Sequence, residues 1–317
     1  MGALSTSELA IEPNRPARTG RTKVVYVMGS GHSGSTILGV TLGNCDGCFY
    51  AGELDNWLIR SGTPVLGGAE RVEFWDLVRE NVTCAGGLFG DRAKHYLERS
   101  LALFRVHQWP TRRRLRPRYR QVAQELYDAI AHVSGATHVV DSSHFPLRAR
   151  ELQSLGGVDM YLVFLIRDPQ SVVHSFNLHV NRHDTMARLS RTLNTNADLW
   201  MTHLLSLLVF MRHPRKRRML VRHEDFLAAP ERVLGEILRR VDSEAEIPDL
   251  GSLKTGFPLF GNRLIKSDVI ALKRRVARPR RRSHLTSALQ LPWAALFSRM
   301  QSVRGVSEPG EHAAASS

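Results

Sequence analysis

Cysteine is scarce in this chain: Cys45, Cys48 and Cys84 are its three cysteines. Three are too few for a disulfide framework, and a reducing cytoplasm is therefore the expected location. A structural zinc site needs four ligands, and beyond the pair Cys45 and Cys48 only Cys84 could add another thiolate. The pair is interpreted as structural, and no metal is expected.

Long apolar runs are also missing. No stretch approaches the roughly 20 apolar residues of a membrane span, and residues 1–22 lack the apolar core of a secretory signal. Residues 1–22 are expected to be a disordered leader and residues 301–317 a disordered tail. Residues 23–300 are predicted to form one domain.

Acidic residues are few relative to basic ones: 30 Asp and Glu stand against 44 Lys and Arg, a formal net charge of +14. Most of this surplus is interpreted as a solvated basic surface, but contact with an anionic saccharide, lipid or membrane surface stays open. Nucleic acid is not expected, because no aromatic platform or known binding motif accompanies the charge. The segment 285–300 is expected to be a helix packed on the domain, with a place at a membrane surface as the alternative. The surplus is concentrated in 112–120, 212–218 and 273–282.

The lysine of a Walker-type phosphate loop is also absent from this chain. In "VVYVMGSGHSGSTILG" (24–39), Gly29, Gly34 and Thr36 have the spacing of a Walker phosphate loop, but Ser35 replaces the lysine. The apolar run before the loop predicts a buried strand over 23–29, and the run after it predicts a helix. Backbone N–H groups and hydroxyls at such a junction suit anionic oxygens. Without the lysine, a phosphosulfate fits better than a triphosphate.

Further apolar runs alternate with helical patterns along the chain. They predict an α/β fold, a P-loop-like parallel sheet flanked by helices, with a helical insertion at about 55–135 after the second strand. The run 91–107, "YRQVAQELYDAIAHV" after the basic run, and a segment from Pro146 to Gly156-Gly157 are predicted to be helical. Because ligands bind at the carboxyl ends of parallel strands, the polar residues that follow the strands should meet at one edge. The later strands are predicted at 48–54, 137–143, 159–166 and 218–226, and the polar residues are Glu53, Asp141, Ser142, Ser143, Arg167 and Asp168.

Five stretches in order resemble one family. The chain from 23 to about 265 looks like the sulfotransferase superfamily that uses 3′-phosphoadenosine-5′-phosphosulfate (PAPS), in its bacterial and Golgi-type branches. The stretches are "GHSGSTILG", "FYAGEL", "VVDSSHFPLRARELQSL", "FLIRDPQSVVHS" and "LVRHEDFLAAP".

The resemblance implies a donor site for PAPS, with PAP as product. It assigns the 5′-phosphosulfate to the glycine loop, and the 3′-phosphate to Arg167 and Ser175. A late loop of the family often closes over the 3′-phosphate, and Gly261, Asn262 and Arg263 match it. The loop positions are Gly31, His32, Ser33, Gly34, Ser35 and Thr36.

The resemblance also implies transfer of a sulfuryl group to a hydroxyl or amine of an unidentified small molecule, saccharide or lipid. Glu53, in a Gly-Glu pair, is the candidate base, and His32 could donate a proton to the leaving phosphate. Ser142, Ser143 and His144 are candidates for acceptor binding.

The chain departs from the family pattern at several positions, which puts its pH dependence in doubt. His32 and His144 replace the usual cations, His223 replaces a frequent Tyr, and Phe257 stands where a His is common. Two alternatives remain open: a P-loop-type kinase or NTPase, and a PAPS-fold binding protein without activity.

Overall fold

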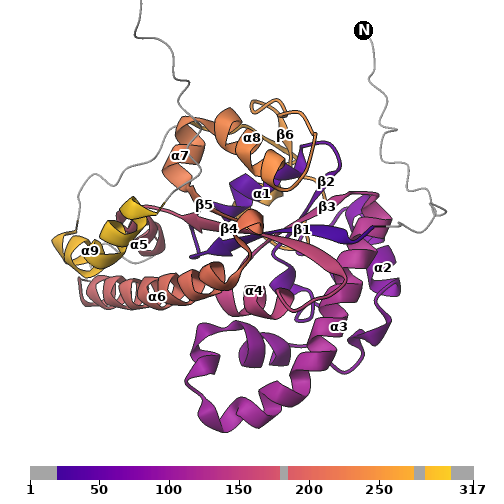
Figure 1. Cartoon of the computed structure of the whole chain (residues 1–317), viewed down its shortest axis with the longest axis horizontal. Helices are drawn as coiled ribbons and strands as arrows, with labels where there is room; N and C mark the ends of the chain where they lie inside the picture. The colour runs from indigo at the N-terminus through magenta and orange to yellow at the C-terminus, as the bar shows by residue number, and fades with distance from the viewer. Residues whose placement is uncertain (1–19, 179–184, 275–282, 301–317) are drawn as a thin grey trace, which may run out of the picture.

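The structure, a computed structural model, describes residues 20–178, 185–274 and 283–300 (Figure 1). The predicted leader (apart from residues 20–22) and tail lie outside these ranges. Five strands form one sheet in the order β2-β3-β1-β4-β5, and every neighbouring pair is parallel. This confirms the predicted parallel α/β fold, with all the strands ending at one edge. The strands are β1 (Thr22–Gly29), β2 (Cys48–Gly52), β3 (His138–His144), β4 (Val158–Ile166) and β5 (Arg218–Arg222).

The sheet separates two apolar cores, because side chains alternate between the two faces of a strand. Val24, Tyr26 and Met28 of β1 join one core, and Val25 and Val27 join the other. Helices cover both faces (Figure 1). On the second core lie α1 (Ser35–Gly43), α7 (His223–Ala228) and α8 (Pro230–Arg240); on the first lie α2 (Ala69–Glu80), α3 (Trp109–Ser134), α4 (Pro146–Leu152), α6 (Thr185–Arg212) and α9 (His284–Arg299).

The remaining elements lie at the margins of the sheet. Helix α5 (Pro169–Asn177) packs on α6 through Val172, Val173 and Leu199. Trp293 and Phe297 of α9 are buried in the first core, so the segment 285–300 is a helix packed on the fold, as predicted. A two-stranded antiparallel sheet pairs β6 (Leu253–Lys254) with β7 (Val269–Ile270), and a short helix η7 spans Arg263–Lys266.

The segment between β2 and β3 is largely helical, and the predicted helix "YRQVAQELYDAIAHV" lies within α3, but two other expectations for this segment are wrong. The continuous helix expected over 91–107 is wrong: a short π-helix over 94–98 is followed by 3₁₀ turns, because Leu101, Phe104 and Val106 do not share a buried face with Leu97. The basic run 112–120, expected before a helix, lies inside α3, since arginine favours helix and Pro110 occupies the first turn. The short elements are η1 (Leu54–Asn56), η2 (Thr83–Ala85), η3 (Lys94–Glu98), η4 (Ser100–Leu103) and η5 (Val106–Gln108).

Two other predicted boundaries are also wrong, whereas one is confirmed. The strand expected in 48–54, with its end at Gly52-Glu53, ends at Gly52, whose φ of 80° turns the chain into η1. The strand expected over 218–226 ends at Arg222, and α7 follows, with Glu224 and Asp225 in a first turn that favours acidic residues. The helix from Pro146 ends at Leu152, before Gly156-Gly157, because turn hydrogen bonds at Ser154 and Leu155 replace the helical pattern.

A buried ion network joins the helical insertion to the edge of the sheet. Arg148 of α4 lies 3.3 Å from Asp141 of β3 and 2.9 Å from Glu98 of the insertion. Tyr127 of α3 donates to Asp141 at 2.6 Å, and Tyr119 donates to Glu98. Because all five side chains are buried, each charge depends on the others for its compensation.

Replacing Arg148 with methionine should lower the free energy of unfolding by about 3–5 kcal/mol, because two buried carboxylates lose their cation. Urea denaturation followed by circular dichroism measures this change. Arg150→Met is the matched control, since Arg150 lies on the same helix but is exposed, and it should change stability by less than about 0.5 kcal/mol. Equal stability of the two variants would contradict the structural role given to Arg148.

Candidate functional site at the carboxyl edge of the sheet

The loop between β1 and α1 is shaped by its glycine. Gly34 precedes α1 with a φ of 96°, and no side chain caps the helix. The first N–H groups of α1 therefore have neither an intrahelical acceptor nor a side-chain cap. A Cβ atom at Gly34 would lie 2.3 Å from Nδ1 of His223, so only glycine fits between the loop and α7.

Three predicted donor-site residues meet at the other side of the loop. Nη1 of Arg167 donates to the carbonyl of His32 at 2.8 Å, and Oγ of Ser175 lies 3.0 Å from Nδ1 of His32. The His32 ring also packs edge-on against Phe176, with centroids 4.3 Å apart. His32 has a φ of 60°, an uncommon conformation for a residue other than glycine. The end of β4 and helix α5 thus hold the loop together with His32.

Three polar atoms around this loop are buried and have no hydrogen-bond partner among the described residues. They are Oγ of Ser33, Nε of Arg167 and Nδ1 of His223. Burial, with the nearby Arg167 cation, lowers the pKa of His223 to about 4, so its imidazole is neutral at pH 7. Buried polar groups normally have hydrogen-bond partners. Three unpartnered polar atoms beside a guanidinium and the N-terminus of a helix are therefore suited to bind an oxyanion.

Glu53 lies directly after β2, where its backbone N–H donates to the carbonyl of Phe260 at 2.9 Å. Burial raises the pKa of its carboxyl to about 8, and the neighbouring Asp55 and Asp141 add to the shift. Lys94 from the insertion opposes it and forms an ion pair with Asp55. A carboxyl with a pKa near neutrality is suited to accept or donate a proton.

The residues that end β3 divide into buried and partly exposed groups. Ser142 and Ser143 are 0% exposed; the Ser142 hydroxyl lies 3.0 Å from that of Tyr50, and the Ser143 hydroxyl contacts Asp141 and accepts from the backbone N–H of Asp55 at 3.0 Å. Their contacts hold the sheet edge together.

His144 is partly exposed and adopts a left-handed conformation, with a φ of 53°. Its ring stacks on Phe145 at a centroid distance of 4.4 Å, and burial lowers its pKa. Asp198 of α6 interacts with it electrostatically: burial raises the pKa of Asp198, and His144 lowers it.

The late loop lies beside Glu53, at the end of β2. The Phe260 carbonyl, just before Gly261, accepts from Glu53, and Asn262 caps η7 by accepting from Leu264 at 2.8 Å. Asn262 and Arg263 are exposed. Among the described residues, no hydrogen bond joins Gly261, Asn262 or Arg263 to the Arg167 side of the site.

Two residues near the site carried no signal in the sequence. Lys94 lies in the insertion and Asp198 lies within a long helix, and neither belongs to a recognisable motif. Because Lys94 and Asp198 lie far along the chain from Glu53 and His144, no sequence pattern predicts their electrostatic interactions with these residues. His223 was singled out only as a departure from a Tyr, and its contact with Gly34 explains why a side chain there matters to the loop.

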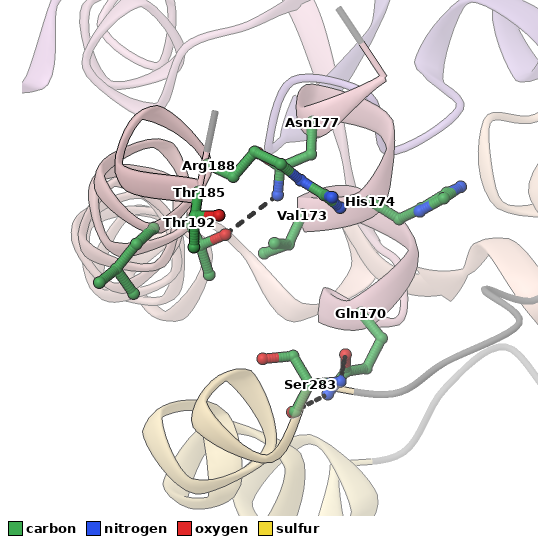
Figure 2. A pocket seen from close by; sticks show the side chains of 9 residues that line it. Gln170, Val173, His174, Asn177, Thr185, Arg188, Thr192 and Ser283 are labelled. Carbon is green, nitrogen blue, oxygen red and sulfur yellow. Dashed lines mark hydrogen bonds between the residues drawn. The ribbon is translucent and has the colours of Figure 1, made fainter. Parts of the chain in front are cut away.

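A separate pocket of about 340 Å³ lies between α5, α6 and the start of α9. Figure 2 shows Gln170 of α5 hydrogen-bonded to Ser283, and Asn177 bonded to Thr192. None of the predicted site residues lines it. It lies on α5 away from Ser175, and it is distinct from the loop site.

The described residues contain neither a metal-binding cluster nor a membrane-spanning helix. No cluster of three or more His, Cys, Asp or Glu side chains in the described chain could hold a metal ion. No helix within the described ranges is long and apolar enough to cross a membrane. The three cysteines are free thiols, and Cys45 donates to the Thr41 carbonyl at 3.6 Å.

Comparison with solved structures finds sulfotransferase domains. The domain from the curacin biosynthetic pathway covers 87% of this chain and 99% of its own length, with a TM-score of 0.52 and 15% identity. This likeness supports the fold. The domain from the olefin synthase of Synechococcus PCC 7002 gives 18% identity, a TM-score of 0.47, and coverage of 89% of this chain and 98% of that one. Sulfotransferase STF9 from Mycobacterium avium gives 12% identity, a TM-score of 0.46, and coverage of 91% and 78%.

Comparison of sequences gives a family but no individual relative. No curated protein matches the chain. A model of the sulfotransferase family matches residues 25–246, which include the glycine loop, Glu53 and the Arg167 region. The match spans well over half of the chain. The protein belongs to the sulfotransferase family.

Proposed function

We propose that the protein transfers a sulfuryl group from PAPS to a hydroxyl or amine of an acceptor molecule. The observation that carries the proposal is the set of three unpartnered buried atoms around the loop, on Ser33, Arg167 and His223. Ser33 and His223 lie beside the amide groups that begin α1, where a phosphosulfate finds donors without a Walker lysine, and Arg167 contacts the loop at His32.

The proposed donor site uses both sides of the loop. Amide groups from Gly31 to Thr36, with the hydroxyls of Ser33, Ser35 and Thr36, would bind the 5′-phosphosulfate. Arg167 and Ser175 would bind the 3′-phosphate, because a guanidinium fork pairs well with phosphate oxygens. Gly261, Asn262 and Arg263 are proposed to close over the bound nucleotide.

The proposed reaction needs one proton transfer. The acceptor oxygen or nitrogen forms a bond to sulfur while the bond from sulfur to the bridging phosphate oxygen breaks, which leaves PAP. Glu53 takes the proton of the acceptor in its carboxylate form. The loop amides, with His32 as a proton donor, stabilise the charge that develops on the leaving phosphate.

The acceptor-binding side of the proposal rests on His144. Of the three residues predicted there, His144 alone is partly exposed. Ser142 and Ser143 are buried, so in the proposal they position β3 and Glu53 rather than contact the acceptor. Incubation with labelled PAPS and pools of small molecules, saccharides and lipids identifies the acceptor class. A cytoplasmic location remains part of the proposal.

The first test uses ligand-dependent thermal stability. PAP at about 100 times its Kd should stabilise the wild-type protein by about 2.7 kcal/mol, which raises Tm. Arg167→Ala should remove most of this gain, because a charged hydrogen bond to phosphate is worth about 1.5–3 kcal/mol. Differential scanning fluorimetry measures both effects.

Arg212→Ala is the control for lost positive charge, since Arg212 is exposed at the end of α6, and it should keep the full response to PAP. Stabilisation by ATP with Mg²⁺ in the absence of any response to PAP would instead identify a kinase or NTPase.

The second test concerns the proposed base. Glu53→Gln should reduce kcat by about 10²–10⁴-fold while the PAP response is kept, because the amide retains the shape but cannot accept the proton. In the wild type, kcat/KM should rise with pH up to about 8, since the raised pKa keeps Glu53 protonated below that value. Sulfate transfer to an identified acceptor, measured from pH 6 to 9, gives the profile.

Lys94→Met extends the test, because Lys94 lowers the pKa of Glu53. Its loss should move the rise in kcat/KM to higher pH. A Glu53→Gln variant with wild-type turnover, or a profile that Lys94→Met leaves in place, would remove Glu53 as the base. A protein that binds PAP but transfers sulfate to no acceptor would be a binding protein of this fold.

A further inference from the structure

The turns before α3 expose large apolar side chains. Leu101 and Phe104 are each 63% exposed, Val106 is 61% exposed and Trp109 is 54% exposed. We call residues 99–116 the insertion tip. Figure 1 shows the turns before α3 and its first part projecting away from the sheet. Four such side chains within nine residues form a patch that a water-facing loop would not need.

The tip is also strongly basic and has no acidic residue. The segment from 99 to 120 contains no Asp or Glu, so its positive charge is not neutralised along the chain. The arginines of the segment are Arg99, Arg105, Arg112, Arg113, Arg114, Arg116, Arg118 and Arg120.

A hollow of about 370 Å³ lies where the tip meets α4, and both apolar and basic side chains line it. Arg112 is only 5% exposed, and Nη1 donates to the carbonyl of Ala102 at 3.1 Å. Its Nε is buried without a partner among the described residues. The hollow is lined by Leu103, Trp109, Arg112, Arg113, Arg116 and Arg150.

The charges around Arg112 leave a net excess of cations at the hollow. Glu151 is the nearby carboxylate, but it is buried and held by Arg116 at 2.9 Å and by Arg120 at 2.8 Å. No ion pair within the described ranges includes Arg112, Arg113 or Arg150. Burial lowers the pKa of Arg112, and so does Arg116, while Glu151 opposes the shift. A buried guanidinium in this setting is stabilised by an anion.

We propose that the insertion tip docks on a bilayer of anionic phospholipid, with a lipid phosphate in the arginine-lined hollow and with Phe104 and Trp109 in the interface. Phosphate oxygens supply the partner that Nε of Arg112 lacks. Aromatic and aliphatic side chains next to a basic cluster are the composition that binds a negatively charged membrane surface.

A soluble phosphate or a nucleic acid fits the same observations less well. Either would satisfy the arginines, but neither would remove Leu101, Phe104 and Val106 from water, since a phosphate backbone offers them no apolar surface. A bilayer of anionic lipid would bind the arginines of the tip and would also remove its apolar side chains from water. The inference does not depend on the donor site, because no residue of that site belongs to the tip.

Flotation of the full chain with vesicles tests the proposal. The protein should float with vesicles of phosphatidylcholine and phosphatidylglycerol, and should stay behind with vesicles of phosphatidylcholine alone. The double variant Arg113→Glu, Arg150→Glu should lower the partition by at least about tenfold, since each basic residue near an anionic surface adds to binding.

The matched control is Arg215→Glu, Lys216→Glu, which changes the net charge equally at two exposed positions outside the tip. It should keep its partition within about twofold of the wild type. Equal loss in both double variants would overturn the proposal, because net charge and not this surface would then drive binding.

Quenching by brominated lipid tests the orientation. Vesicles with brominated acyl chains should quench the fluorescence of the wild type, and Trp109→Phe should lose most of that quenching. Trp200→Phe removes another exposed tryptophan, on α6, and should leave the quenching in place. The reverse result would place α6 and not the tip at the membrane.

Two more outcomes would overturn the proposal in favour of another ligand. Inorganic phosphate that raises Tm of the wild type but not of Arg112→Met, with no flotation, would assign the hollow to a soluble anion. Duplex DNA that binds the wild type and not the Arg113→Glu, Arg150→Glu variant, again with no flotation, would identify nucleic acid as the partner.

Discussion

The ion network centred on Arg148 is the constraint on which the rest of the structure depends. It fixes Asp141 in the middle of β3, and Asp141 in turn holds Ser143, whose hydroxyl accepts from the backbone N–H of Asp55 beside Glu53. The same guanidinium reaches Glu98 in the insertion. Because a buried charge without its partner costs several kcal/mol, the insertion and the sheet edge are held in one arrangement. The surroundings of Glu53 are a product of this arrangement.

The site has two halves that follow the order of the strands. The ends of β1 and β4 with α5 and α7 supply a neutral histidine, a guanidinium and a glycine turn, which suit oxyanion binding. The ends of β2 and β3 supply carboxylates and His144, and the insertion supplies Lys94, a set of groups that suits proton transfer. Since β3 lies between β2 and β1, the two halves lie side by side on one edge.

The sequence predicted the parallel sheet correctly, for identifiable reasons. Strands that are buried on both faces appear in the sequence as apolar runs. The runs that predict β2, β3 and β4 end in polar residues at the carboxyl edge of the sheet. His32 belongs to the predicted 5′-phosphosulfate loop, and Arg167 and Ser175 belong to the predicted 3′-phosphate motif. In the structure His32 contacts both Arg167 and Ser175. The insertion was harder, since its turns alternate buried Leu97 with exposed Leu101 and follow no single period. Lys94 reaches the site through a tertiary ion pair with Asp55 that no local pattern encodes.

The link between Lys94 and the environment of Glu53 bears on how this chain could be redesigned. An insertion between core strands is the usual segment to exchange when a different acceptor is wanted. Here the exchange would also remove Lys94 and Glu98, and with them a cation that tunes Glu53 and a carboxylate that balances Arg148. Grafted segments would therefore have to supply a lysine and a glutamate at equivalent places. An exchange of the insertion would therefore also change the pKa of Glu53, unless the sheet edge were rebuilt with it.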